Sequence, residues 1–478
     1  MLRRLDPPSP RLPPARVDRL RSALERALGP SKVQTSSEAL FAFAGDESEN
    51  EPVLPDAAVL ASSAADVLAA LKVALDEGVP ITPRAAGSGK SGGAIPLAGG
   101  IALATAGLGR ILDIDATELT ATVEPGVVLG ELHRAVEELG LFYPPDANSL
   151  SWCALGGNIA ENAGGPRAFK YGVTRDYVLG LDVGLVGGQA LTVGRKTKKG
   201  VTGYDVAGLL VGSEGTLAVT TRATLRLIPK PEVVATLLAL FPDVRACGAA
   251  VQSILAAGVV PRCIELLDAP TLAAVRAGGV DVDGAARAML ILEVDGVEAT
   301  TLVEQERVGD ACDRAGALSV LVAQSASQRD RLWAARRALS TTTRAMARHK
   351  VSEDVVVPRT RIPDLLDEVD RIREKTQIRM LTYGHAGDGN LHVNYLWDDP
   401  DAGPRVELGL EMLFRRVVEL GGTLTGEHGV GLSKRRFLPL EQSAPLIELQ
   451  RGLKRVFDPN DLLNPGKVFP EREGHGAC

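Results

Sequence analysis

Five short stretches of this sequence are unusually rich in glycine, and they constrain the fold more than any other feature. Residues 84–93, 156–172, 212–215, 384–389 and 426–431 hold 17 of the chain's 51 glycines. A glycine inside a helix costs up to about 1 kcal/mol relative to alanine. It also permits positive φ angles and close approach of the backbone to a ligand. We therefore predict that these stretches are loops that enclose ligands.

Composition narrows the class of protein. The chain has 478 residues, enough for two to four domains, and it is 45% hydrophobic and 24% charged, as expected for a globular protein. The net charge of -7 and the aromatic content of 4% argue against binding to nucleic acid. Five widely spaced cysteines without a CxxC pair argue against a disulfide framework, a zinc ribbon or an iron–sulfur cluster. No apolar run reaches the roughly 18 residues of a membrane span. We expect a soluble cytoplasmic enzyme, with attachment to the inner membrane through a partner left open.

Hydrophobic periodicity predicts an alternation of helices and strands throughout the chain. In the first half we expect helices over 16–28, 64–76 and 128–139, strands over 57–60, 100–105 and 118–124, and a hairpin over 176–193. Pro229 and Pro231 indicate a domain junction. Beyond it we expect strands over 233–241, 262–268 and 288–296, and helices over 244–258, 297–316 and 331–350. This pattern predicts an N-terminal arm and helix (1–51), two domains (52–231 and 232–422), a final segment (423–470) and a tail (471–478).

The first glycine-rich loop contains the sequence GSGKSGG, which invites comparison with a phosphate-binding P-loop. The P-loop pattern GxxxxGK[ST] fails here, because Arg84 stands where the first glycine is required. Backbone N–H groups between glycines, together with Ser88, Lys90 and Ser91, could still bind an anion. For this loop alone, a flexible connection between strands is an equal alternative.

Three of the six histidines fall close together near the end of the chain. His385 and His392 flank an Asp-Gly turn, which can bring both imidazoles to one face, and Glu427-His428 adds a carboxylate and a third imidazole. Two histidines and a carboxylate form a common ligand set for Zn²⁺, Mn²⁺ or Fe²⁺. The alternative is a group of structural histidines without metal. We expect the other three histidines, His133, His349 and His475, to be solvated.

Eight motifs occur in the order found in one known family. They are PRAAGSGKSGG, YPPDANS, LGGNIAENAGG, KYG, GSEGTLAVTT, GHAGDGNLH, GEHGVG and DPNDLLNPGK, within residues 52–467. The chain resembles the FAD-linked oxidases of the vanillyl-alcohol-oxidase type, in the branch of D-lactate dehydrogenase, the FAD subunit of glycolate oxidase and D-2-hydroxyglutarate dehydrogenase. The resemblance implies an α+β fold. A PCMH-type FAD-binding domain of two α/β subdomains would carry an α+β cap domain with an antiparallel sheet, and a C-terminal segment would return to the flavin.

The resemblance also implies which residues hold the cofactor FAD. The pyrophosphate would lie on Ala86, Gly87, Ser88, Gly89, Lys90 and Ser91. The ribityl chain and ring would lie along Pro144, Ser149, Gly156, Gly157, Asn162 and Gly164. Glu214 and Val219 would lie at the adenine end, and Asn464 would return to the flavin. No histidine lies between residues 52 and 132, so we expect non-covalent FAD. Cys153 is expected to be a buried small residue and not a covalent link.

In the same family, His385, His392 and Glu427 correspond to metal ligands and His428 to the catalytic base. Arg336 corresponds to the residue that binds the substrate carboxylate, although a solvated basic helix face is the alternative for this arginine-rich segment. The D-2-hydroxyglutarate dehydrogenase branch of the family carries a lysine near the position that Ser352 occupies here. The absence of this lysine favours a short acid as the substrate.

The resemblance thus implies an FAD-dependent dehydrogenase that oxidises a short D-2-hydroxy acid, D-lactate or glycolate, to the 2-oxo acid. Electrons would leave to a quinone, a cytochrome or an iron–sulfur partner subunit. The alternatives are a D-2-hydroxyglutarate dehydrogenase, a non-redox ether-lipid alkyl transferase and a flavin-binding subunit whose partner performs the chemistry. The oligomeric state stays open, with a homodimer as one option.

Overall fold

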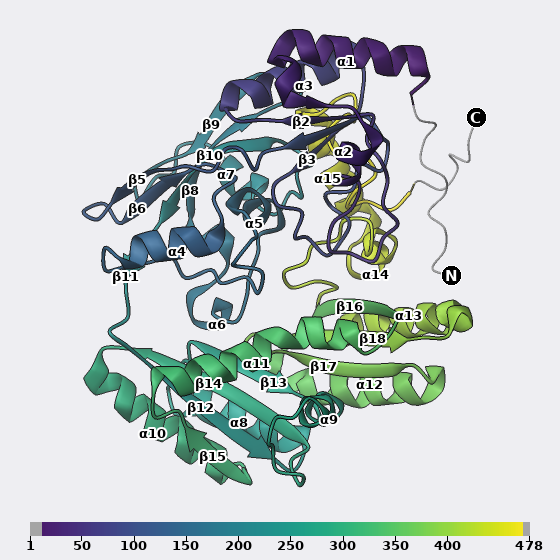
Figure 1. The fold of residues 1–478 in the computed structure, drawn as a ribbon. Coiled ribbons are helices and arrows are strands. Elements are labelled where there is room, and N and C mark those ends of the chain that lie inside the picture. Colours follow the sequence, from purple (N-terminus) through teal and green to yellow (C-terminus); the bar gives the residue numbers. More distant parts are fainter. Residues whose placement is uncertain (1–11, 472–478) are drawn as a thin grey trace. The chain divides into compact units, whose positions relative to one another are not determined.

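The structure is a computed structural model that describes residues 12–471 (Figure 1). Expectations for residues 1–11 and 472–478, including His475 and most of the tail, lie outside the described residues. Within the described part the chain forms two compact units. The terminal unit contains residues 12–163, 173–230 and 427–471, and the central unit contains residues 164–172 and 231–426. The chain passes between the units after Lys230, and the short segment 164–172 falls in the central unit and not with its neighbours.

The first sheet of the terminal unit is built around three parallel strands. Its order is β1(Val33–Gln34)-β2(Ala57–Leu60)-β4(Ile101–Ala104)-β3(Ile81–Arg84), with β1 antiparallel to β2. Helix α3 (Ala64–Glu77) begins where Ser63 Oγ accepts a hydrogen bond from Asp66 N at 3.2 Å, and it ends at Gly78 with φ +58°. The predicted N-terminal helix, α1 (Pro14–Leu28), packs on α3. Helix α1 is therefore part of this unit's core, through Leu20 and Leu24.

The second sheet of the terminal unit is antiparallel throughout. Its order is β5(Ile111–Asp115)-β6(Thr120–Val123)-β10(Val219–Arg226)-β8(Val178–Gly184)-β9(Ala190–Gly194). The structure confirms the predicted strand over 118–124 and the hairpin over 176–193. Strand β5 is missing from the prediction because most of its residues are partly or fully exposed, so it lacks a buried alternation.

Further helices and strands complete the terminal unit. They are α2 (Ser37–Phe41), α4 (Leu129–Glu137), β7 (Leu141–Phe142), α5 (Leu155–Glu161), α7 (Val206–Leu210), β11 (Ile228–Pro229), α14 (Leu438–Glu441) and α15 (Ala444–Phe457). The end of the chain returns to the first sheet. Leu463 forms a parallel bridge with Ile81, and Asn464 N donates to Ile81 O at 2.8 Å.

The central unit is one seven-stranded antiparallel sheet with helices on both faces. The strand order is β15-β12-β14-β13-β17-β18-β16. The bounds are β12 (Val233–Phe241), β13 (Cys263–Leu267), β14 (Ala288–Gly296), β15 (Ser319–Val322), β16 (His349–Val356), β17 (Arg379–His385) and β18 (Asn390–Trp397). The predicted strands over 233–241 and 288–296 match β12 and β14. The predicted antiparallel sheet is confirmed.

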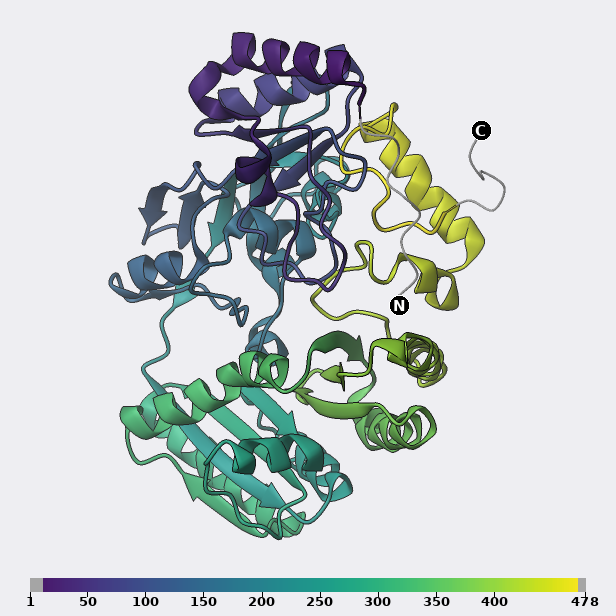
Figure 2. The ribbon, with the colours of Figure 1, turned by 45° about the vertical axis from the view of Figure 1, so that its right-hand side comes forward.

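Helices of the central unit divide between the two faces of this sheet. One face carries α8 (Val244–Ala256), α10 (Glu298–Arg314), α12 (Ile362–Thr376) and α13 (Gly403–Glu419), of which α12 and α13 lie side by side (Figure 2). The other face carries α9 (Ala269–Ala277) and α11 (Ala326–Ala345), and α6 (Ala168–Tyr171) packs against β13.

The predicted helix over 331–350 is wrong at both ends. Ser325 Oγ accepts from Gln328 N at 3.2 Å and starts α11 earlier. His349 and Lys350 already belong to β16, because they pair with Trp397 and Leu396 of β18. Among residues 12–471, no helix combines the length and the apolar character that crossing a membrane requires.

Candidate active site

Buried polar side chains are concentrated on one face of the central sheet. The register pairs Glu265 with His385, Tyr383 with His392, and His392 with Asp354. Because paired residues share a face and alternate residues along a strand do too, these side chains all emerge on the face that α11 covers. On β14, the strand next to that of Glu265, Glu293 pairs with Cys263 and lies on the same face.

His385 and His392 meet across a tight connection. Residues 386–389 form the turn between β17 and β18, and the two imidazole centroids lie 5.3 Å apart with an interplanar angle of 87°. The turn requires glycine at position 389, where φ is +85° and a Cβ would lie 2.0 Å from Val357 O. The prediction that the Asp-Gly turn brings both rings to one face is confirmed.

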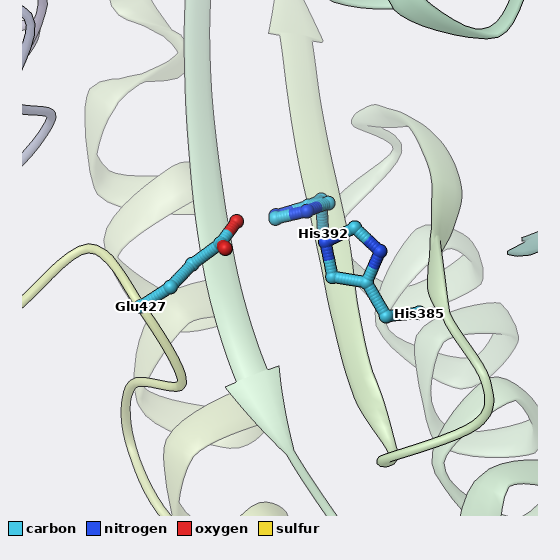
Figure 3. Close-up of side chains that lie close together, drawn as sticks. All are labelled: His385, His392 and Glu427. Carbon is cyan, nitrogen blue, oxygen red and sulfur yellow. The ribbon is translucent and has the colours of Figure 1, made fainter. Parts of the chain in front are cut away.

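Glu427 reaches the same place from the segment that follows Thr425. The Asp354 carboxylate accepts hydrogen bonds from Gly426 N at 2.8 Å and from Thr425 Oγ1 at 3.1 Å. These bonds fix the backbone immediately before Glu427. One ligand atom from each of His385, His392 and Glu427 lies within 4.8 Å of the others (Figure 3). This donor set suits a divalent metal such as Zn²⁺, Mn²⁺ or Fe²⁺.

Glu265 is a hydrogen-bonding partner of His385 in this group. Its carboxylate bonds Nδ1 of His385, which leaves the opposite ring nitrogen, Nε2, for a metal. Arg336 Nη2 lies 2.5 Å from the other carboxylate oxygen. Complete burial would raise the pKa of Glu265, but Arg336 and His385 outweigh that effect and lower the pKa to about 2. Glu265 therefore stays ionised.

The sequence contains a signal for Glu265 that our reading of the motifs missed. It is the one charged residue in the apolar strand Cys263–Leu267. A charged side chain is rarely buried unless it is paired, so a lone glutamate in such a strand calls for a partner.

Arg336 is buried, with a relative exposure of 7%, so the alternative of a solvated basic face is wrong for this residue. Its guanidinium lies 4.9 Å from the ring centroid of Tyr383, in addition to pairing with Glu265. Within residues 12–471, its Nε has no hydrogen-bond partner. One side of the guanidinium can therefore still bind an acceptor.

Two of the glycine-rich loops of the terminal unit lie against each other. Ser91 O accepts from Leu432 N at 2.8 Å, and a Cβ on Gly431 would lie 2.3 Å from Ser91 O. The Ser91 hydroxyl is buried and has no hydrogen-bond partner within residues 12–471. By contrast, Gly89 and Gly157 leave space, because a Cβ there would meet other atoms only at 3.8 Å or beyond. An orphaned hydroxyl beside open glycine backbone fits a cofactor cradle.

Glu214 binds protein backbone. Its carboxylate accepts from Val430 N at 2.8 Å and from Gly431 N at 2.7 Å. Burial raises the pKa of Glu214, although these two N–H groups act in the opposite direction. We expected Glu214 at the adenine end of FAD, but the structure commits its side chain to the loop that carries His428.

Asn464 joins three segments of the terminal unit. Its Nδ2 donates to Gly93 O at 3.0 Å and to Glu214 O at 2.9 Å, while its Oδ1 accepts from Lys467 Nζ at 3.0 Å. Burial lowers the pKa of Lys467 to about 7. The predicted returning residue thus reaches the first glycine-rich loop.

The other predicted cofactor residues occupy loops and element ends. Ala86, Gly87, Ser88 and Lys90 lie in the loop after β3, Pro144 is buried after β7, and Gly156 lies in α5. Ser149 O accepts from Cys153 N, Asn162 caps the end of α5, and Val219 begins β10. Gly164 stands apart, because it falls in the central unit.

His428 follows Glu427 directly, and its Nε2 lies 3.9 Å from Glu427 Oε1. Both side chains are mostly buried, with exposures of 14% and 17%. The predicted base is therefore attached through the backbone to the predicted metal ligand, and Glu214 binds the residues that follow it.

The prediction for His133 needs correction, because this residue is buried and its Nε2 lies 2.9 Å from Pro145 O, so it is not solvated. His349 is exposed, as predicted; it lies in β16 and stacks on Trp397 with ring centroids 5.3 Å apart. Cys153 is buried, as expected, and burial raises its thiol pKa.

Family comparisons agree with this architecture. Residues 55–194 match the family described as "FAD binding domain", and residues 230–468 match "FAD linked oxidases, C-terminal domain". The structure resembles p-cresol methylhydroxylase with a TM-score of 0.79 and 16% identity, covering 95% of this chain and 97% of that one. It also resembles alkyldihydroxyacetonephosphate synthase with a TM-score of 0.72 and 19% identity, covering 97% of this chain and 86% of that one. These two likenesses show the fold.

Curated relatives narrow the family. A glycolate oxidase subunit of Bacillus subtilis is 39% identical, over 94% of this chain and 96% of the relative. A D-lactate dehydrogenase of Anaerostipes hadrus is 33% identical, over 87% and 89%. A D-2-hydroxyglutarate dehydrogenase of Stutzerimonas stutzeri is 31% identical, over 95% and 99%. The chain therefore belongs to the FAD-linked oxidases with a PCMH-type FAD-binding domain, among the homologues of these three hydroxy-acid enzymes.

Proposed function

We propose that this protein is an FAD-dependent dehydrogenase that oxidises a short D-2-hydroxy acid, D-lactate or glycolate, to the corresponding 2-oxo acid. The observation that carries the proposal is the group of His385, His392 and Glu427. The buried Arg336 is connected to this group through its ion pair with Glu265. A flavoprotein that needs only to bind FAD has no use for a buried ligand set of this kind.

The glycine-rich loops of the terminal unit would hold FAD without a covalent bond. When bound, FAD supplies the two-electron acceptor of the reaction. The open backbone at Gly89 and Gly157 and the unpartnered Ser91 hydroxyl support the position of the cofactor. The side chain of Glu214 would act indirectly, by holding Val430 and Gly431.

The metal would be held by His385, His392 and Glu427. When bound there, a divalent ion lowers the pKa of a coordinated hydroxyl group. Glu265 fixes the orientation of His385 through Nδ1, so that the ligand nitrogen is in place before any metal arrives.

His428 is proposed as the general base that takes the proton of the substrate hydroxyl. Its place next to Glu427 supports this role, because a base must lie within reach of the group that it deprotonates. Arg336 is proposed to bind the substrate carboxylate through the side of its guanidinium that Glu265 does not use. Arg336 would then contact two carboxylates, that of Glu265 and that of the substrate.

The residues on the sheet face beyond His392 support a short substrate. Ser352 pairs with Asn394 on that face, where a serine hydroxyl carries no charge for a second carboxylate. The lysine nearest to it on the same face, Lys350, donates to Ser340 O at 3.1 Å and to Thr343 Oγ1 at 2.8 Å. This lysine already binds α11, so we favour a monocarboxylic acid.

The test is an anaerobic titration of the FAD-loaded protein with matched D- and L-2-hydroxy acids, in which the absorbance of oxidised flavin is followed. We expect D-lactate or glycolate to bleach the flavin, L-lactate to leave it oxidised, and D-2-hydroxyglutarate to act weakly. A parallel series after chelation should show no bleaching. Bleaching by D-2-hydroxyglutarate alone would favour the longer-acid alternative.

The electron acceptor is proposed as a quinone, a cytochrome or an iron–sulfur partner subunit, with oxygen a poor acceptor. The Bacillus subtilis relative is named as a glycolate oxidase subunit, which supports a protein partner. Turnover with a soluble quinone analogue, compared with turnover in air alone, tests this part. The ether-lipid transferase alternative rests on the shared fold and predicts no net bleaching by any hydroxy acid.

A further inference from the structure

The segment 164–172 leaves the terminal unit and returns to it after nine residues. At its base, Ala163 O accepts from Thr174 N at 3.1 Å and from Thr174 Oγ1 at 2.8 Å. The base is therefore closed directly after α5, which carries Gly156 and Gly157. The residues between belong to the central unit, and we refer to 164–172 as the strap.

The strap is anchored in the central unit by one buried carboxylate. Lys170 Nζ lies 2.6 Å from Asp295 Oδ1 and also donates to Asp295 O at 2.6 Å. Tyr171 Oη donates to Asp295 Oδ2 at 2.8 Å, and Arg262 Nη1 reaches the same oxygen at 3.1 Å. The Asp295 side chain has no exposed surface, so it is committed to these three partners.

Next to this anchor, Phe169 presses on the turn between the two histidines. A Cβ on Gly387 would lie 2.7 Å from Phe169 Cγ, so the turn backbone and the ring are in close contact. Arg359 packs over the same ring with its guanidinium carbon 5.3 Å from the centroid, and its Nη1 donates to Gly387 O at 3.2 Å. Gly387 is thus held between an aromatic ring and a charged donor.

We propose that Phe169 is a positioning residue for the metal site, because it holds the 386–389 turn that joins the strands carrying His385 and His392. This inference rests on the proposed metal site and adds a residue to it. The turn is four residues long, so a shift at Gly387 moves both ligand strands at their ends. Second-layer contacts of this kind typically change metal affinity by about 10- to 100-fold.

The experiment measures the affinity of the FAD-loaded full chain for Mn²⁺ and Zn²⁺ by competition with a chelator, without substrate. Phe169→Ala should weaken the affinity by about 10-fold or more. Its FAD content and flavin spectrum should match those of the wild type. Phe169→Tyr, which keeps the ring over Gly387, should restore the affinity. Phe41→Ala is the matched control, because this phenylalanine is 68% exposed and is far from Phe169 in the sequence.

Two negative results are distinguishable. If the wild type itself binds neither ion, the proposed metal site fails. If the wild type binds metal and folded Phe169→Ala binds it equally well, the strap inference is overturned. If Phe169→Ala does not fold, Lys170→Met takes its place. It removes the ion pair to Asp295 but keeps the ring, and unchanged metal affinity in that variant would also overturn the inference.

Discussion

The carboxylate of Glu265 bonds Nδ1 of His385, and the two residues are directly paired across neighbouring strands β13 and β17. The bond fixes which ring nitrogen of His385 faces the Glu427 side of the site. Replacing Glu265 by glutamine keeps the size but removes the charge that balances Arg336 and His385.

We therefore expect Glu265→Gln to weaken Mn²⁺ or Zn²⁺ binding by about 10- to 100-fold, measured on the FAD-loaded protein by calorimetry. Glu293→Gln is the control, because Glu293 lies on the same sheet face but binds Trp333 Nε1 at 2.5 Å and Thr236 Oγ1 at 2.8 Å. Equal affinities in the two variants would show that Glu265 does not support the metal.

Glu214 provides a second prediction, in the terminal unit. Its carboxylate accepts from two backbone N–H groups, at Val430 and Gly431. Glutamine can accept with one atom only, so its amide would face the second N–H group at a cost of about 1–3 kcal/mol. Glu214→Gln should slow flavin reduction by D-lactate at least about 10-fold in stopped-flow measurements. An unchanged rate of flavin reduction would show that Glu214 does not position His428.

The buried carboxyl group of Asp268 should make the free energy of unfolding depend on pH. This buried residue caps α9, and burial raises its pKa from the usual 3.8 to about 6. Between these values the folded state binds more protons than the unfolded state, so folding stability contributed by this group rises as the pH falls. When the pH falls from 7 to 4, the free energy of unfolding of the wild type should rise by about 1–3 kcal/mol relative to that of Asp268→Asn. The difference in Tm between the two proteins measures this change. A difference that stays constant with pH would refute the shifted pKa.

Ser352 offers a test of substrate length. Ser352→Lys places a cation on the sheet face next to Asn394, its partner in the register. If the substrate extends along this face, the ratio of kcat/KM for D-2-hydroxyglutarate to that for D-lactate should rise by about 10-fold or more. Ser319→Lys, in the edge strand β15, serves as the control and should leave the ratio unchanged. No change in either variant would place the distal end of the substrate elsewhere.

The group of His385, His392 and Glu427 and several strands could be predicted because their signals are local. Glycines close to these three residues mark tight turns, and the predicted bounds of strands β12 and β14 match the structure. Glu265 escaped prediction because its partners, His385 and Arg336, are 120 and about 70 positions away in sequence, and only the sheet register brings them together.

His133 shows a different kind of failure. We expected it to be solvated because charged residues surround it in sequence. The helix period places it with Leu129, Leu132 and Val136 on the buried face of α4, so the necessary signal was present. The strap could not be foreseen for a third reason, since nothing in its sequence reveals that nine residues belong to another unit.

The role of His428 is tested by the reduction of bound flavin with D-lactate in His428→Ala, compared with the wild type under anaerobic conditions. We predict that the variant retains FAD and metal but that D-lactate no longer bleaches the flavin, because the hydroxyl proton has no acceptor. Dithionite should still reduce it, which confirms that the flavin is competent. Bleaching by D-lactate at the wild-type rate would contradict the proposed role of His428 and, with it, the mechanism.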